Sequence, residues 1–411
     1  MALPRPRRNS AEIVAPAGNF EKLRIAVRFG AHAVYFGGER FNLRAGSGNF
    51  PLDDIRTALG FCRSHGVKAI FLMNAFLHEG DIGPTREYIA ELRGFDFDAI
   101  MVSDPGMLAL LREGGIGCDM HLSTQMSTLN GYAAKFWEDA GIRRIVLARE
   151  VTIDEIRGIR ERTGAELEAF VHGALCISYS GRCLLSRYFT GRDANLGECT
   201  HPCRWRYALV EENREGSHLE ILEHARGTEI LSSKDLCLIH RLPDYIDAGV
   251  DAFKIEGRMK SLYYTANTAR IYAEAVSLAG DHEAFAARLP FWKRDLDLVS
   301  HRPYTDDLFN EFESMKELSV PYVRGAMFLG YREAPGADET EAMVKVFNPI
   351  RAGEKIEAIY PIRDHVIRDR SYTVREIIDG GAVTDMARPG RVCLLRFDAP
   401  VYEDAIFRRV M

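Results

Sequence analysis

From residue 12 to about residue 280 the chain repeats one unit, a short apolar run followed by a turn and an amphipathic helix. Helical spacing of apolar residues is clearest in Phe20–Phe29, Leu52–Ser64, Tyr132–Ala140 and Ile153–Arg162. The apolar runs are Ile13–Ala17, Ala33–Gly37, Ala69–Asn74, Ala99–Ser103, Met120–Gln125, Arg144–Ala148, Leu167–Val171 and Ala252–Ile255. Continuous apolar strands that alternate with helices are typical of a parallel sheet covered on both faces. Eight of them favour a closed (β/α)8 TIM-like barrel, an α/β fold, over a doubly wound sheet.

The repeat is interrupted once, between the seventh and the eighth strand. The intervening residues hold most of the cysteines and then three segments that we interpret as short antiparallel strands, Tyr207–Glu212, Leu219–Glu223 and Thr228–Ser232. An insertion after a barrel strand lies at the C-terminal face, where barrel enzymes build their active sites. We therefore predict a barrel over residues 11–285 with an insertion at about 174–233, preceded by a disordered N-terminus of residues 1–10.

The hydrophobic pattern changes again towards the C-terminus. Residues 286–320 are predicted to be a linking segment, and from residue 321 to 411 the helical period is lost. Turn signals such as Asn348–Pro349 and Pro389–Gly390 separate short segments of alternating polarity. These predicted strands are Val323–Leu329, Ala342–Val346, Lys355–Ile359, His365–Ile367, Thr373–Ile378 and Val392–Phe397. Their arrangement predicts a small C-terminal β-barrel.

Composition and charge are those of an ordinary folded protein, with 411 residues, 46% hydrophobic residues and a net charge of −6. A globally basic nucleic-acid binder is excluded by this charge, whereas a local basic patch is not. The first ten residues are not followed by an apolar run long enough for a secretory signal, and no segment reaches the roughly 18 apolar residues that a membrane helix needs. We expect a cytoplasmic protein with no membrane attachment.

Four of the eight cysteines lie close together, in the pattern Cys176-x6-Cys183-x15-Cys199-x3-Cys203. Thiolates are the ligands that both zinc and iron–sulfur clusters prefer. Common zinc modules bring two close cysteine pairs, whereas here only the last two cysteines form one. The spacing therefore favours an iron–sulfur cluster, with zinc and unligated thiols as alternatives. Cys237 is a possible substitute ligand, although its apolar neighbours favour a position in a core helix.

The segment around these cysteines is locally basic and aromatic. Its cations and aromatic residues are Arg182, Arg187, Arg192, Arg204, Arg206, Tyr188, Phe189, Trp205 and Tyr207. Interleaved arginines and aromatic rings contact phosphates and stack on bases in nucleic-acid-binding proteins. We take Arg182, Arg187, Arg204 and Trp205 as candidate RNA-binding residues. The alternative is a solvated insertion whose arginines pair with nearby carboxylates.

Polar residues follow the ends of the predicted strands, where a barrel places its reacting groups. They are Asn74, Asp104, His121, Gln125, Arg149, Glu150, His172, Lys254, Glu256 and Arg258. Charged groups beside apolar strands are costly unless they are paired or solvated in a cavity, so together they predict a polar pocket. Arg44 follows the second strand and is a candidate for binding a carboxylate, because guanidinium binds carboxylate in a bidentate manner.

Several hydrolase signatures are missing from the sequence. It contains no His-Glu-x-x-His, no Gly-x-Ser-x-Gly and no phosphate-binding loop of the Gly-x-x-x-x-Gly-Lys type. Standard hydrolytic machinery is therefore not indicated.

One long motif resembles a known family. The stretch from Glu168 to Ser186 reads EAFVHGALC and, four residues later, GRCLLS. This is similar to the defining motif of the collagenase-like peptidase family, peptidase U32. Supporting blocks are Ala15–Gly18, Ala33–Gly37, His121–Gln125 and Lys254–Arg258, and the resemblance extends over nearly the whole chain. Within the family, Ser180–Ser186, Gly197–Trp205 and Ser233–Leu236 are similar to the tRNA hydroxylation protein P branch.

The resemblance implies an iron–sulfur enzyme, with a [4Fe-4S] cluster on Cys176, Cys183, Cys199 and Cys203, that makes 5-hydroxyuridine at the tRNA wobble position. It implies prephenate or a similar small carboxylate as donor, the tRNA anticodon loop as partner, and a need for the iron–sulfur assembly machinery. Candidate roles are catalysis for His172, Lys254 and Glu256, and substrate binding for Arg44, His121, Gln125, Arg149 and Arg258. The alternatives are a collagenase-like peptidase that uses Cys176 with His172, and a non-catalytic cluster-bearing subunit of a larger hydroxylase.

Overall fold

A closed barrel of eight parallel strands forms the first part of the molecule. The computed structural model describes residues 11–43, 48–175, 183, 185–192, 200, 202, 209–210, 218–219, 222–224, 227–229, 234–306 and 322–411. Each barrel strand pairs with the next along the chain, and the last strand pairs with both the first and the seventh. The strands are β1 (Glu12–Pro16), β2 (Ala33–Gly37), β3 (Lys68–Met73), β4 (Ala99–Val102), β5 (Asp119–Leu122), β6 (Arg144–Val146), β7 (Glu166–Ala174) and β13 (Ala252–Ile255). The predicted (β/α)8 barrel is confirmed.

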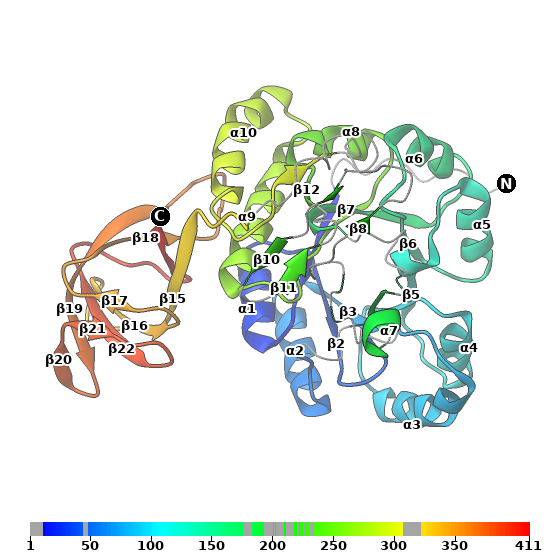
Figure 1. Ribbon diagram of the computed structural model, residues 1–411, viewed down its shortest axis with the longest axis horizontal. Helices are drawn as coiled ribbons and strands as arrows, with labels where there is room; N and C mark the ends of the chain where they lie inside the picture. Colours follow the sequence, from blue (N-terminus) through cyan, green and yellow to red (C-terminus); the bar gives the residue numbers. More distant parts are fainter. Residues whose placement is uncertain are drawn as a thin grey trace.

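Helices surround this barrel on the outside, as Figure 1 shows. They are α1 (Phe20–Arg28), α2 (Leu52–Ser64), α3 (Ile82–Leu92), α4 (Pro105–Glu113), α5 (Gly131–Asp139), α6 (Ile153–Arg160), α8 (Leu242–Asp247), α9 (Leu262–Leu278) and α10 (His282–Leu296). Capping side chains fix several of their starts: Thr152 accepts a hydrogen bond from the Glu155 amide in the capping box of α6. Asp104 accepts hydrogen bonds from the first amides of α4 and from the Leu77 amide. Asp104, which follows β4, therefore stabilises both the start of α4 and the loop that contains Leu77.

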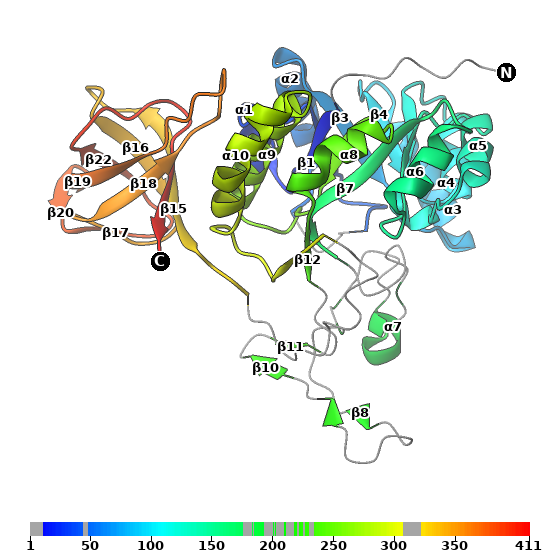
Figure 2. The ribbon, with the colours of Figure 1, turned by 90° about the horizontal axis from the view of Figure 1, so that it is seen from above.

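After β7 the chain departs from the repeat. Strand β12 (Asp235–Cys237) pairs antiparallel with the end of β7, and β14 (Tyr304–Thr305) pairs with β12. The described part of the insertion contains helix α7 (Leu185–Thr190) and two short antiparallel pairs. These pairs join β8 (Leu209–Val210) with β9 (His218–Leu219) and β10 (Leu222–His224) with β11 (Gly227–Glu229). Figure 2 shows α7 and these strands on the same side of the barrel as β12.

The C-terminal residues form a second, antiparallel barrel beside the first (Figures 1 and 2). Six strands pair in the order β18-β23-β15-β16-β22-β19, and β18 also pairs with β19, which closes the sheet. The elements are β15 (Ala326–Pro335), β16 (Glu341–Val346), β17 (Ile350–Arg351), β18 (Lys355–Ile359), β19 (Arg370–Asp379), β20 (Ala382–Thr384), β21 (Met386–Ala387), β22 (Val392–Phe397) and β23 (Ile406–Val410). The predicted C-terminal β-barrel is confirmed.

Two details of this barrel differ from the sequence prediction. The predicted strand His365–Ile367 is wrong, because Asp364 and His365 both have positive φ, at 50° and 60°, and so turn the chain. The last strand, β23, was missing from the prediction although it pairs with both β15 and β18. Its Arg408 and Arg409 interrupt the apolar alternation.

Buried ion pairs join the second barrel to the helices of the first. Asp295 of α10 accepts hydrogen bonds from Arg270 of α9 and from Arg408 of β23, the latter at 2.9 Å, and all three side chains are almost fully buried. Arg270 also pairs with Asp369 at 2.7 Å. Because each charge has an opposite charge in direct contact, this apolar interface accommodates them. No helix of the described residues is both long enough and apolar enough to cross a membrane.

Candidate functional site

A cavity of about 80 Å³ opens at the C-terminal end of the first barrel, where the chemistry of such barrels is placed. Its floor and walls come from residues inside the strands and from residues that follow them. The lining residues are Tyr35, Leu43, Leu72, Asn74, Met101, Ser123, Thr124, Gln125, Arg149, Phe170, Lys254, Glu256 and Arg258. The cavity therefore brings together five of the predicted site residues: Gln125, Arg149, Lys254, Glu256 and Arg258.

Lys254 is the charged group at the floor of this cavity. Its amino group donates a hydrogen bond to the Glu168 carboxylate at 2.8 Å and lies 4.3 Å from the centre of the Tyr35 ring. The side chain is only 5% exposed. Strand periodicity places Lys254 inside the barrel, because alternate residues of β13 point to opposite faces.

Arg258 forms part of the cavity wall and is fixed by two asparagines. It donates hydrogen bonds to Asn42, at 3.0 Å, and to Asn49. A Cβ atom on Gly37 would lie 3.0 Å from the guanidinium, so the glycine leaves the space that the arginine occupies. The side chain thereby ties β13 to the loop that follows β2.

Gln125 and its neighbours form the polar side of the cavity. The Gln125 carbonyl oxygen accepts hydrogen bonds from Ser103, at 2.7 Å, and from Ser123. The Thr124 hydroxyl donates to the Leu147 carbonyl at 3.0 Å. The third cavity hydroxyl, that of Tyr35, donates to the Ile255 carbonyl at 2.9 Å. All three hydroxyls therefore donate to an amide or carbonyl oxygen. Among the described residues, no histidine or carboxylate contacts the Ser123 or Thr124 hydroxyl to activate it as a nucleophile.

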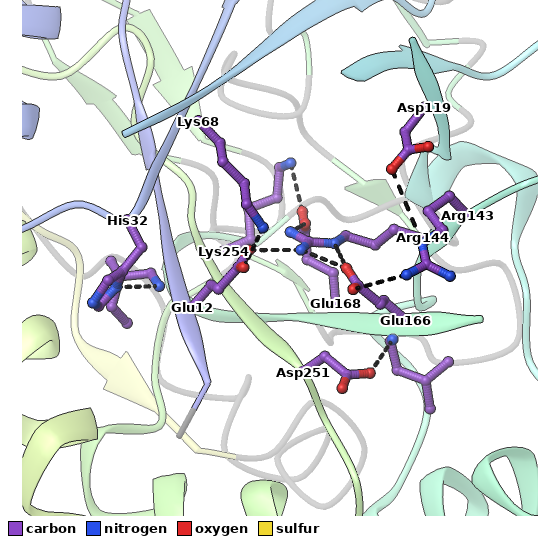
Figure 3. Close-up of polar contacts among 12 residues, drawn as sticks. Glu12, His32, Lys68, Asp119, Arg143, Arg144, Glu166, Glu168, Asp251 and Lys254 are labelled. Carbon is purple, nitrogen blue, oxygen red and sulfur yellow. Dashed lines mark hydrogen bonds and ion pairs between the residues drawn. The ribbon is translucent and has the colours of Figure 1, made fainter. Parts of the chain in front are cut away.

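Beneath the cavity a series of charged side chains connects the buried Lys254 to the half-exposed Lys68, as Figure 3 shows. Arg144 of β6 contacts three carboxylates, Glu12 at 2.6 Å, Glu166 at 2.7 Å and Glu168 at 3.3 Å. Lys68 pairs with Glu12, and this pair lies at one end of the series of charges while Lys254 lies at the other. Burial raises the pKa of Glu12, but the charges and hydrogen bonds of Arg144 and Lys68 outweigh burial and lower it to about 2. We call these six residues the interior charge chain.

His121 lies inside the barrel beside this chain and is 5% exposed. Burial, together with the positive charges of Arg144 and Lys254, holds its pKa well below the ordinary histidine value. The imidazole is therefore neutral at pH 7. His121 is not among the residues that line the cavity, so its predicted role in substrate binding stays a prediction.

His172 lies outside the cavity, among tyrosine rings. Its Nδ1 is 3.1 Å from the hydroxyl of Tyr272, and that hydroxyl donates to the Val171 carbonyl at 3.0 Å. Burial lowers the pKa of His172 to about 3. The imidazole ring of His172 packs against the rings of Tyr264, Tyr272 and Tyr304.

A larger groove of about 470 Å³ adjoins the cavity between α6, β12 and α8. Arg149 and Phe170 line both spaces, and the guanidinium of Arg149 lies 4.4 Å from the centre of the Phe170 ring. These two side chains therefore form the wall that the groove and the cavity share. Glu150 lines the groove but does not line the cavity.

With this geometry in place, the chain can be compared with known proteins. The model of the family described as peptidase family U32 matches residues 18–318, which is most of the chain. The chain belongs to the U32 family.

Three relatives of this U32 protein carry different names. It is 33% identical to "tRNA hydroxylation protein P1" of Bacillus subtilis, over 97% of this chain and 94% of the relative. It is 35% identical to a "23S rRNA 5-hydroxycytidine" synthase of Escherichia coli, over 75% of this chain and 48% of the relative. It is 34% identical to "Collagenase" of Porphyromonas gingivalis, over 73% of this chain and 74% of the relative. The predicted resemblance to the family and to its tRNA hydroxylation branch is thus confirmed.

Most of the predicted metal-binding and RNA-binding residues of this U32 chain lie outside the described residues. These are Cys176, Cys199, Cys203, Arg182, Arg204 and Trp205, together with the side chain of Arg187 in α7. Arg44, predicted to bind substrate, also lies outside the described residues. Cys183 is described, and its side chain is buried. Within the described residues no group of three or more histidines, cysteines or carboxylates could hold a metal ion. The four-cysteine cluster therefore stays a prediction.

Cys237 lies on β12, directly across from His172 of β7, so the predicted core-helix position is wrong. Pairing with the extended end of β7 makes this segment a strand, whatever its apolar neighbours favour locally. Its sulfur is 3.8 Å from the Tyr272 hydroxyl, and burial raises the pKa of the thiol to about 11. The thiol is thus protonated at pH 7 in this environment.

Sequence reasoning missed the interior charge chain of the U32 barrel and the asparagines that hold Arg258. Glu166 and Glu168 alternate within β7, and Arg144 begins β6, so charged residues stood at inward positions of apolar strands. Buried charges of this kind require partners. Because a buried lysine requires an acidic partner, Glu168 on the neighbouring strand could have been predicted as the partner of Lys254.

Proposed function

We propose that this chain hydroxylates tRNA, converting the wobble uridine to 5-hydroxyuridine. The observation that carries the proposal is the polar cavity at the C-terminal end of the barrel, with Arg149, Lys254 and Arg258 against the single carboxylate of Glu256. An excess of cations favours an anionic ligand, because guanidinium and ammonium groups bind carboxylates. The similarity over nearly the full length to a protein named for tRNA hydroxylation supports the same reading.

A small carboxylate donor, such as prephenate, is proposed as the ligand of this cavity. Lys254 and Arg149 are the proposed contacts to its carboxylates, and the amide donors of Asn74 and Gln125 line the same cavity. Glu256, which also lines the cavity, is the carboxylate that we propose accepts or returns a proton there.

An iron–sulfur cluster on Cys176, Cys183, Cys199 and Cys203 is proposed as the cofactor. Four thiols within one insertion match the ligand set of a [4Fe-4S] cluster, and Cys183, the described one of the four, is buried. When bound, such a cluster would supply redox or Lewis-acid chemistry. The residues of this chain would bind the donor, exclude water and present the base.

The RNA substrate is proposed to reach the same face of the barrel. An anticodon loop presents unpaired bases, so a uridine is available for chemistry at little cost in unstacking. The arginines and the tryptophan of the insertion, Arg182, Arg187, Arg204 and Trp205, are the proposed contacts to the loop. The relative named for 23S rRNA 5-hydroxycytidine supports RNA hydroxylation as the general activity.

A peptidase is the second candidate, because one relative is named Collagenase. It requires an activated nucleophile, and the sequence offers Cys176 with His172. Two observations favour the hydroxylase instead. His172 is enclosed by tyrosines, with Nδ1 committed to Tyr272, and the cavity hydroxyls donate to an amide or carbonyl oxygen.

Two experiments test the proposed function. Purification without oxygen, followed by assay of iron, sulfide and zinc, is expected to give a brown protein with matching iron and sulfide contents. Stoichiometric zinc would contradict the cofactor. Nucleoside analysis of tRNA from a deletion strain is expected to show lost 5-hydroxyuridine, and an unchanged level in a strain without a redundant enzyme would refute the activity. A hydroxylation that depends on a second protein would identify the chain as a subunit.

A further inference from the structure

The partner of Lys254 is a carboxylate with no access to solvent. Glu168 is 0% exposed, and its two oxygens contact different cations, Lys254 at 2.8 Å and Arg144 at 3.3 Å. A buried carboxylate is stable only when opposite charges surround it. Glu168 therefore connects the cavity floor to the rest of the interior charge chain.

The ion pair with Glu168 determines the charge of Lys254. The Glu168 carboxylate is fully buried, and its second cation, Arg144, also contacts Glu12 and Glu166. A neutral Lys254 would remove the nearer of the two cations that contact Glu168, which is costly for a buried carboxylate.

We propose that Glu168 is a positioning residue that keeps Lys254 protonated and directs its ammonium group into the cavity, where it binds the carboxylate of a small organic acid. This inference deepens the proposed function and rests on it for the identity of the acid. It assigns Lys254 the role of a fixed cation. This role excludes two others for Lys254, that of a base that accepts a proton and that of a nucleophile that attacks a carbonyl group, because each requires the neutral amine.

The surroundings of Lys254 agree with a permanent positive charge. The groups that face it are the Tyr35 ring of β2, the Met101 sulfur of β4 at 3.8 Å, Phe170 of β7 and neutral His121 of β5. Glu256 and Arg258, in the segment that follows β13, line the same cavity. The faces of aromatic rings attract cations. The positive charges of Lys254 and Arg144 also contribute to keeping His121 neutral.

The size of the cavity limits what binds at the floor. About 80 Å³ corresponds to the volume of roughly two or three water molecules. A carboxylate group fits this space, and the remainder of a larger donor would extend from it. Lys254 is therefore expected to bind the innermost carboxylate of the donor.

Carbamylation by cyanate measures the proposed charge state directly, because the small reagent reacts only with the neutral amine. The amine nitrogen adds to the carbon of isocyanic acid, and one amine proton moves to the reagent nitrogen, giving a urea group with no change in oxidation state. The full-length protein is treated at pH 8, and modification of Lys254 is followed by peptide mass spectrometry. Exposed Lys355 serves as the internal reference for reagent activity.

Two variants separate the charge effect from accessibility. Glu168→Gln removes the partner of Lys254, whereas Glu166→Gln removes a carboxylate two residues away on β7 that contacts Arg144 but not Lys254. We expect Glu168→Gln to accelerate the carbamylation of Lys254 by about tenfold or more, and Glu166→Gln to leave it within about twofold. Equal rates in both variants and the wild type would overturn the proposal.

A measurement on the wild type covers the case in which Glu168→Gln fails to fold. Prephenate is titrated into the protein by calorimetry between pH 6 and pH 9, and its affinity is expected to stay constant because Lys254 remains charged. A loss of affinity within this range that is absent from Lys254→Arg would overturn the proposal. These outcomes are independent of 5-hydroxyuridine analysis. Unchanged 5-hydroxyuridine would refute the proposed function but would not affect the conclusion from the cyanate experiment. Equal cyanate rates would refute only the role of Glu168.

Discussion

The two barrels of this chain fill their interiors in opposite ways. The first holds the interior charge chain, which connects Lys68 and Glu12 to Lys254 (Figure 3). The second is filled mainly with apolar side chains such as Leu395 and Phe407, among which the hydroxyls of two buried tyrosines share a hydrogen bond of 2.7 Å. Apolar filling is sufficient to stabilise a barrel of this size. Because buried ion pairs can often be replaced by apolar side chains without loss of stability, the charges inside the first barrel are better explained by the cavity above them.

Removal of Arg144 is expected to have the largest effect on stability. Arg144→Ala leaves Glu12, Glu166 and Glu168 without their shared cation in a buried site, which costs about 4 kcal/mol. The measurement is the free energy of unfolding from guanidinium titration of the full-length protein. The adjacent Arg143 is 41% exposed, with carboxylates no closer than 3.9 Å, so Arg143→Ala is the matched control and should change little. Similar losses in both variants would show that the interior charges are not coupled.

A cavity in the second barrel is expected to cost slightly less and to be independent of pH. Leu395→Ala deletes a fully buried side chain, and such truncations cost about 3 kcal/mol. Because no charge is removed, the loss should be the same at pH 5 and pH 8. Denaturation at the two pH values measures it, and a pH-dependent loss would contradict an apolar interior.

Acid is expected to weaken the first barrel through Glu12. The pKa of this carboxyl is about 2 in the folded protein and 4.5 in its ordinary state. A lowered folded-state pKa contributes stability above pH 4.5 that is lost as the pH falls towards 2. Glu12→Gln should therefore lose about 2 kcal/mol at pH 7 and show a shallower decline in acid than the wild type. Parallel acid profiles for the two proteins would contradict this.

The smallest effect is expected at the surface of the second barrel. Arg391 pairs with Asp379, and the arginine side chain is 59% exposed. Exposed pairs gain little because water screens them. Arg391→Ala should leave the unfolding midpoint unchanged in thermal denaturation, and a clear decrease would mean that surface charges matter as much as those of the interior.

The fold was predictable from the sequence because the barrel strands are buried on both faces and appear as uninterrupted apolar runs. Boundaries were less accurate: β5 ends at Leu122, since Thr124–Met126 form a 3-10 turn that continues the apolar run without continuing the strand. Strand β23 was missed because Arg408 and Arg409 appear polar in sequence, although they pair with Asp295, Glu357 and Glu354. Long-range partners of this kind leave no local pattern.

The cavity was predictable in part, because the ends of parallel strands meet at one face. This rule placed Gln125, Arg149, Lys254, Glu256 and Arg258 together. It failed for His172, because β7 continues past the barrel edge to pair with β12. The pairing of β7 with β13 also shifts register beside His172, between Lys254 and Ile255. A register shift depends on tertiary pairing and is not encoded in residue spacing.

The most direct test of the central claim is the 5-hydroxyuridine content of tRNA in a host that lacks its own tRNA uridine hydroxylation genes. Nucleoside mass spectrometry is applied to cells that express the wild type, Lys254→Arg or Lys254→Met, at equal protein levels. The wild type is predicted to restore the nucleoside, Lys254→Arg to retain part of it through its positive charge, and Lys254→Met to abolish it. No restoration by the wild type, or full restoration by Lys254→Met, would contradict a tRNA hydroxylase built on a charged lysine in the barrel cavity.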